Sequence, residues 1–214
     1  MATNGRSART KGSSAELKLA KELSAWWGLT FHRTVGSGNL HWDDFRVAGD
    51  IVPPIDSKFP FCCESKKHDS PAWTLENAVL NNLNIPSWWA QCLGDARSVN
   101  LIPMLAFTRN RAKTFIMLPY DSYIYVNVRN KKLPVMRTTI TTYDKLKDIY
   151  ESFDVMVMTL EGLVSFTPEE IIEHYTDYDW EAISLLTHLN PIKEPETKSM
   201  EELTDDVMGK LKKL

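Results

Sequence analysis

Two acidic residues and a lysine lie close together in apolar surroundings and have the types needed for metal-assisted hydrolysis. Glu64 and Lys66 follow the apolar run Phe59–Cys63, and residues two apart on a strand point to the same face. Asp50 opens a second short apolar stretch, and a hairpin through residues 53–58 would bring it beside Glu64. Carboxylates that hold Mg²⁺, with a lysine near the attacking water, are what hydrolysis of a phosphodiester requires.

Each of these residues also has an interpretation that involves no chemistry. Glu64 and Lys66 could form an ordinary ion pair at a sheet edge, and Asp50 could simply shape a turn after Gly49. The apolar context favours the functional interpretation, because unpaired charges in such a run are costly to bury. We therefore treat Asp50, Glu64 and Lys66 as candidate catalytic residues.

The first predicted helix carries a further acid. Ser13 and Glu16 fit the S-x-x-E capping box, and the helix is predicted to run to Trp27 and to end at Gly28. The capping box alone would account for Glu16. The helical spacing, however, puts Glu16 on one face with the apolar residues Ala20, Leu23 and Trp27, which favours an inward direction. Both interpretations stay open at this point.

The elements that must position these residues follow from the hydrophobic pattern. Strands are predicted at 29–35, 47–52, 59–66, 101–108, 114–118 and 123–128, and helices at 74–82 and 86–97. Farther along, a helix near 143–152, a strand near 155–160 and helices after Thr167 and Asp179 are predicted. This order indicates an α/β protein with a mixed central β-sheet flanked by helices.

Charge and composition exclude several classes of protein. The formal net charge of −3 excludes a uniformly basic nucleic-acid binder, and no stretch is apolar enough to span a bilayer. Without the apolar region of a secretion signal, the protein is expected in the cytoplasm, which is the host's if a phage encodes it. Basic residues nevertheless gather near the start, where an arm could be solvated or could contact phosphates: Arg6, Arg9, Lys11, Lys18 and Lys21.

The three cysteines do not predict a disulfide framework or a zinc site. Cys62 and Cys63 are adjacent, which is not the spacing that lets two thiolates chelate one zinc ion, even with Cys92 and His68 included. We expect small buried residues in a reducing compartment.

Two sets of residues carry a resemblance to known nucleases. Gly49-Asp50-Ile51 followed by Glu64-Ser65-Lys66 resembles the signature of the PD-(D/E)XK nuclease superfamily. The basic start, the Lys11–Glu16 helix opening and the Gly-Ser-Gly loop at 36–38 are similar to archaeal and phage-type Holliday-junction resolvases. The resemblance spans roughly residues 5–118. Gly49 replaces the Pro that names the superfamily. The segment 39–49 is longer than expected and contains two rival candidates for the ligand role, Asp43 and Asp44.

The resemblance implies a role for each matching position. Asp50 and Glu64, with the backbone carbonyl of Ser65, would bind Mg²⁺, for which Mn²⁺ could substitute. Lys66 would orient or activate the attacking water, with Glu16 as an additional acid and Gln91 helping to position the water. The DNA contacts would come from Arg33 and Ser37, together with the basic arm, namely Arg6, Arg9 and Lys11.

The resemblance also implies an activity and an organisation. We expect a Mg²⁺-dependent endonuclease that resolves four-way DNA junctions in recombination or repair, and a homodimer, because a two-fold symmetric substrate suits two like active sites. Alternatives are a PD-(D/E)XK nuclease for repair, restriction or end processing, or an inactive nuclease-fold module that binds DNA or protein. Four segments are predicted: a basic flexible arm at 1–12, a restriction-endonuclease-like nuclease core at 13–130, an α+β C-terminal extension at 131–189 and a mobile charged tail at 190–214.

Overall fold

The fold is known from a computed structural model that describes residues 4–34, 48–68, 84–144 and 149–182. The predicted helix at 74–82, the loop with Ser37, the rival acids Asp43 and Asp44 and the tail at 190–214 lie outside these residues.

A single seven-stranded sheet runs through the described part of the chain, with the order β1-β2-β3-β4-β5-β7-β6. Its strands are β1 His32–Arg33, β2 Ile51–Val52, β3 Phe61–Lys67, β4 Ile102–Thr108, β5 Phe115–Pro119, β6 Val135–Asp144 and β7 Ile149–Thr159. The central pair β3 and β4 is parallel, and the other neighbouring pairs are antiparallel. The predicted mixed α/β sheet is therefore confirmed.

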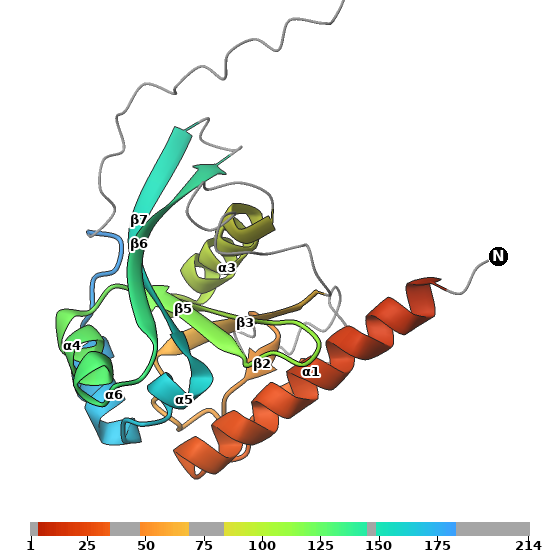
Figure 1. Cartoon of the computed structure of the whole chain (residues 1–214), viewed down its shortest axis with the longest axis horizontal. Coiled ribbons are helices and arrows are strands. Elements are labelled where there is room, and N and C mark those ends of the chain that lie inside the picture. Colours follow the sequence, from red (N-terminus) through yellow and green to blue (C-terminus); the bar gives the residue numbers. More distant parts are fainter. Residues whose placement is uncertain (1–3, 35–47, 69–83, 145–148, 183–214) are drawn as a thin grey trace, which may run out of the picture.

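Helices cover both sides of this sheet. They are α1 Asn4–Trp27, α3 Asn84–Val99, α4 Ser122–Asn130, α5 Leu160–Leu163 and α6 Pro168–Tyr175. Figure 1 shows α1 and α3 on opposite sides of the central strands. α3 lies against the face of β3 that carries Glu64 and Lys66, while α1 lies against the face that carries Ser65 and Lys67. The parallel pair is thus enclosed between two helices, as its apolar sequence predicts.

The ends of α1 and α6 test the capping signals. Gly28 ends α1 with a φ of +75°, as predicted, but the helix begins at Asn4 rather than at Ser13. Residues 4–12, expected to form a flexible arm, are therefore helical. The start predicted at Thr167 is confirmed, since its side chain and that of Glu170 form a reciprocal capping box.

Two predicted elements beyond residue 120 are wrong. The segment 123–128, expected as a strand from its aromatic and β-branched residues, lies in α4, where the Asp121 carboxylate accepts a hydrogen bond from the Ile124 N–H at 2.7 Å. This cap favours a helix over strand propensity. In the segment expected as a helix at 143–152, the described residues 143–144 and 149–152 are the ends of β6 and β7, which pair from Val135↔Met158 to Asp144↔Ile149. This pair of strands projects beyond the rest of the sheet (Figure 1), and β7 joins it to β5.

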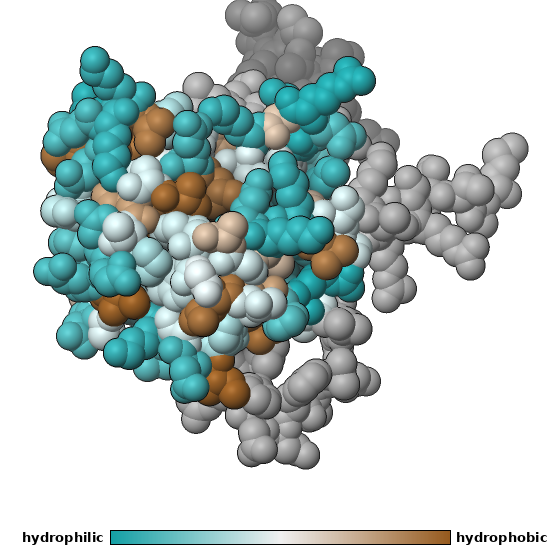
Figure 2. Space-filling model, turned by 90° about the horizontal axis from the view of Figure 1, so that it is seen from below, coloured by the Kyte–Doolittle hydropathy of each residue, from teal (hydrophilic) through white to brown (hydrophobic). Residues whose placement is uncertain are grey.

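The core contains large side chains from the sheet and from the helices on both sides of it, among them Leu23, Phe61, Trp89, Met104 and Met117. Large hydrophobic side chains that remain exposed in the described residues come from several separate elements, for example Leu17, Ile55 and Val126. On the face drawn in Figure 2, hydrophobic side chains are scattered among hydrophilic ones. No helix in the described part of the chain is long and apolar enough to cross a membrane.

Candidate active site

The predicted hairpin brings Asp50 to the central strand. Ile51 on β2 pairs with Cys63 on β3, and the Asp50 N–H donates to the Cys63 carbonyl at 2.8 Å. The Asp50 carboxylate in turn accepts a hydrogen bond from the Ser65 N–H at 2.8 Å. Backbone groups on both sides therefore fix this carboxylate next to β3.

Glu64, Lys66 and Gln91 form a closed triangle of hydrogen bonds. The Lys66 Nζ lies 2.5 Å from Glu64 Oε1 and 2.9 Å from Gln91 Oε1. The Gln91 Nε2 donates to the same Glu64 oxygen at 2.6 Å. Both hydrogen bonds that Glu64 accepts from the described residues thus fall on Oε1, which leaves Oε2 as the oxygen available to a cation. α3 places Gln91 where the resemblance predicted it.

The surroundings of Glu64 favour its protonated form. Burial raises the pKa of this carboxyl to about 7, and the charge of Asp50 adds to the increase, while the hydrogen bond and charge of Lys66 oppose it. One ammonium therefore does not offset the burial of a carboxylate beside a second acid. A bound cation would favour the ionised form of Glu64, because metal binding competes with protons for the same oxygens.

Glu16 faces this site and does not cap its helix. Because α1 begins at Asn4, Ser13 lies inside the helix, and its hydroxyl accepts a hydrogen bond from Arg33. The Arg33 Nε lies 3.1 Å from Glu16 Oε2. Burial and the charge of Asp50 raise the pKa of Glu16, while the charges of Arg33 and Lys66 lower it. The capping-box interpretation of Glu16 is therefore wrong, and Arg33, predicted to contact DNA, is also the ion-pair partner of this acid.

A fourth acid, Asp95, was not predicted. It lies on α3 one turn after Gln91, and its pKa is raised by burial and by the charge of Asp50 and lowered by the charge of Lys66. The i,i+4 spacing from Gln91 was the available sequence signal, since residues four apart share a helix face. It becomes useful only once Gln91 is known to face Glu64.

Gly49 allows the close approach of Asp50 to β3. Its φ is +80°, and a Cβ at this position would lie 2.6 Å from the Cys63 carbonyl oxygen. Proline has a Cβ and holds φ near −65°. The residue that gives the superfamily its first letter therefore does not fit this turn.

The donor set fits a hard cation such as Mg²⁺ and does not fit zinc. No cluster of three or more His, Cys, Asp or Glu side chains suited to hold a metal occurs within the described residues. The site instead offers the carboxylates of Asp50 and Glu64 and the backbone carbonyl of Ser65, which are all oxygen donors. The predicted structural role of the cysteines is confirmed, because Cys62, Cys63 and Cys92 are free and buried. Burial raises the pKa of Cys62 to about 12 and those of Cys63 and Cys92 well above the usual thiol value, so their thiols stay protonated.

The structure thus brings together five side chains that were predicted as catalytic, namely Glu16, Asp50, Glu64, Lys66 and Gln91. Whether Asp43 or Asp44 approaches them, and where Ser37 lies, falls outside the described residues, as do the side chains of Arg6, Arg9 and Lys11.

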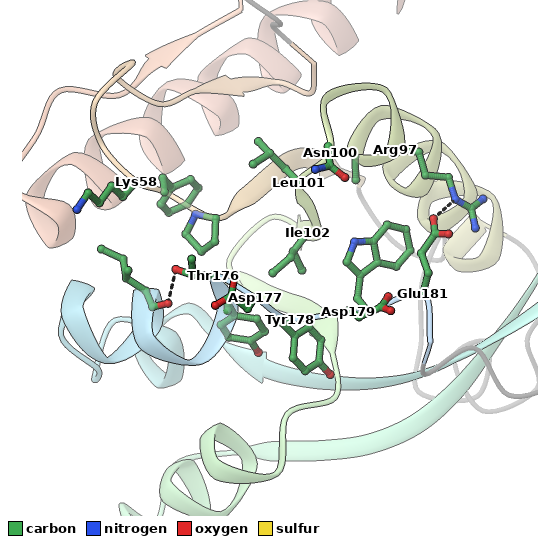
Figure 3. A pocket seen from close by; sticks show the side chains of 16 residues that line it. Lys58, Arg97, Asn100, Leu101, Ile102, Thr176, Asp177, Tyr178, Asp179 and Glu181 are labelled. Carbon is green, nitrogen blue, oxygen red and sulfur yellow. Dashed lines mark hydrogen bonds and ion pairs between the residues drawn. The ribbon is translucent and has the colours of Figure 1, made fainter.

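A separate cavity lies elsewhere. It has a volume of about 860 Å³ and lies between the end of α3, α6 and the segment that follows α6. In Figure 3, Arg97 and Glu181 meet at one end, where the Arg97 Nε lies 2.7 Å from Glu181 Oε1, and Lys58 lies at the other. None of the clustered acids lines this cavity, so it is separate from the candidate active site.

A mixed sheet whose central strand carries Glu64 and Lys66 beside an Asp from the adjoining hairpin defines the PD-(D/E)XK class of nucleases. The chain belongs to a phage family of this class: the family model described as "Phage putative PDDEXK endonuclease" matches residues 7–173. Protein D14 of Escherichia phage T5 is 26% identical over 131 residues, which cover 58% of this chain and 78% of that protein. No solved structure matches the chain.

Proposed function

We propose that this nuclease is a Mg²⁺-dependent DNA endonuclease whose metal is held by Asp50, Glu64 and the backbone carbonyl of Ser65. The observation that carries the proposal is the Glu64–Lys66–Gln91 triangle beside the anchored Asp50. An unbalanced buried acid next to a second acid is what a cation would neutralise. When bound, the metal would supply Lewis-acid stabilisation of charge on the phosphate.

The roles of the neighbouring side chains follow from their hydrogen bonds. Lys66 would orient or activate the attacking water, because its ammonium lies beside both Glu64 and Gln91. Gln91 can both donate and accept, so it would hold that water in line with the phosphate. Glu16 would serve as an additional acid at the far wall of the site, with Arg33 holding its orientation.

For the substrate we propose four-way DNA junctions, cut by a homodimer. The order of the basic start, helix opening, glycine loop and acidic motifs, which resembles the resolvases, supports this choice. Two-fold symmetry supports it further, since a C2 dimer presents two like sites to two like strands. A nuclease for repair, restriction or end processing is the second candidate, because it uses the same residues on other DNA.

One cleavage assay tests both the proposed metal dependence and the proposed substrate. Four-way junction, linear duplex and single strand of matched sequence are incubated with the protein in Mg²⁺, Mn²⁺, Ca²⁺ or chelator, and its mass is measured by light scattering. We expect paired symmetric nicks near the branch point in Mg²⁺ or Mn²⁺ and none with chelator. Equal cleavage of duplex and junction would overturn the junction substrate and leave the nuclease. Full activity in chelator would overturn the metal site.

A further inference from the structure

A groove on the face of the sheet opposite to α3 leads away from the candidate active site. It has a volume of about 280 Å³ and lies between α1 and the ends of β3 and β4. Its walls come from Ser14, Ala15 and Lys18 on α1, from Ser65 and Lys67 on β3, and from the turn 109–112 that joins β4 to β5.

The groove lies close to Asp50 through one residue, Ser65. Ser65 lines the groove and donates its N–H to the Asp50 carboxylate at 2.8 Å. Ser14 and Ala15 directly precede Glu16, and Lys67 directly follows Lys66. Because Glu64 and Lys66 point to the other face of β3, Asp50 and Ser65 are the residues that link the groove to the acids.

The charge along the groove is strongly positive in a chain whose formal net charge is −3. Among the described residues, Lys18, Lys67, Arg109 and Arg111 line it together with one acid, Glu22. Lys18 lies 3.7 Å from that Glu22, but its side chain is 71% exposed, and such exposed pairs hold a lysine only weakly. A row of cations beside a site for phosphodiester hydrolysis is complementary to a polyanion.

Arg111 occupies a backbone conformation that a glycine or asparagine adopts more easily. Its φ is +59°, in a tight turn in which the Ala112 N–H donates to the Arg109 carbonyl at 3.2 Å. Left-handed backbone is disfavoured for a residue with a long side chain. Strain of this kind is typical of positions where the side chain serves binding.

We propose that this groove binds the sugar-phosphate backbone of the DNA strand on one side of the scissile bond. Lys18, Lys67, Arg109 and Arg111 would contact successive phosphates and so set the position of the strand relative to Glu64. The inference rests on the proposed function and adds to it the path of the substrate.

Arg111→Gly is the sharpest test, because glycine suits the left-handed turn and removes the charge without threatening the fold. Binding of a fluorescent DNA duplex is measured by anisotropy in Ca²⁺ over a series of salt concentrations. We expect several-fold weaker binding, a slope of log affinity against log salt that is flatter by about 0.9, and an unchanged or higher melting temperature. Lys18→Gln combined with Arg111→Gly should flatten the slope by about 1.8.

Lys113→Gln provides the matched control. This lysine lies at the same turn but does not line the groove, and its Nζ lies 2.7 Å from Glu161 Oε2. It should change the slope far less than Arg111→Gly. Equal slopes for the two single variants, or a wild-type slope for Arg111→Gly, would overturn the groove and leave the nuclease intact. Absence of DNA binding by the wild-type protein would overturn the proposed function and the groove together.

Discussion

Glu64 and Glu151 are both buried glutamates on strands of the same sheet, yet their surroundings differ. Glu151 is 7% exposed, and each of its two carboxylate oxygens accepts a hydrogen bond from the Arg97 guanidinium, at 3.0 and 3.1 Å. Glu64 is 2% exposed, and the lysine and the amide that contact it both use Oε1. The Arg97 guanidinium binds both oxygens of Glu151 in the bidentate geometry that arginine favours. The two side chains that contact Glu64 bind only its Oε1.

This difference is what we expect between an acid that stabilises the fold and an acid that serves the proposed chemistry. Asp154 repeats the structural arrangement, since both of its oxygens accept hydrogen bonds from Arg137. The charges that act on Glu64, by contrast, are those of the acids Asp50 and Asp95 as well as one lysine. Such an excess of negative charge in a partly closed space is costly without a cation, and sites of this kind are functional more often than structural.

The largest expected effect comes from Glu64→Gln. The proposed metal ligand loses its charge, so cleavage should fall by about 10³-fold or more, in line with a loss of several kcal/mol of transition-state stabilisation. Stability in the absence of metal should stay the same or rise, because a costly buried charge is removed. Turnover on the preferred DNA substrate and urea unfolding measure the two effects. Glu169→Gln, an exposed change on α6, is the control; unimpaired cleavage by Glu64→Gln would make Glu64 a structural acid like Glu151.

The second effect is a dependence of stability on pH. The pKa of Glu64 is raised from 4.5 to about 7 in the folded protein, so the folded state binds this proton more tightly than the unfolded state. The stabilisation is present below pH 4.5 and is lost as pH rises through 7. The total is on the order of 3 kcal/mol. Urea unfolding of the metal-free protein at pH 5 and pH 8 should show this decrease, and Glu64→Gln should lack it. The same decrease in both proteins would mean that other groups cause it.

A smaller effect is expected at the structural acid. Arg97→Met leaves the Glu151 carboxylate buried without its guanidinium, which should cost about 2 kcal/mol of stability, less than for a fully buried pair because the Arg97 side chain is 27% exposed. Cleavage per folded molecule should change little. Lys113→Met, which breaks an exposed pair with Glu161, should cost less than about 0.5 kcal/mol. A clear loss of cleavage per folded molecule would show that Arg97 also positions α3 for catalysis.

The central strands and the acids on them could be predicted because their signals are local. The apolar run before Glu64 defines β3, and alternation along a strand then fixes the direction of Lys66. The proline turn after Val52 indicates the hairpin that carries Asp50. Each of these inferences needs only residues that are neighbours in the sequence or on one hairpin.

The errors lie where the deciding contact is distant or depends on one side chain. The aromatic pattern at 123–128 favours a strand, but the Asp121 cap starts a helix. The ends of β6 and β7, at 143–144 and 149–152, were mistaken for a helix because the pairing of these strands with each other and with β5 sets their structure. Asp95 belongs to the site only through the packing of α3 on β3, and the capping box at Ser13 and Glu16 is absent because α1 begins at Asn4.

The turn at Gly49 limits how this chain can change over evolutionary time. A mutation that restored the proline for which the superfamily is named would force a Cβ against the Cys63 carbonyl and a backbone angle of the wrong sign. A change from glycine to proline at position 49 would therefore require β3 to shift first. Descendants of this protein should keep the glycine even where the acids themselves are free to vary. A search for relatives that requires the proline would pass them over.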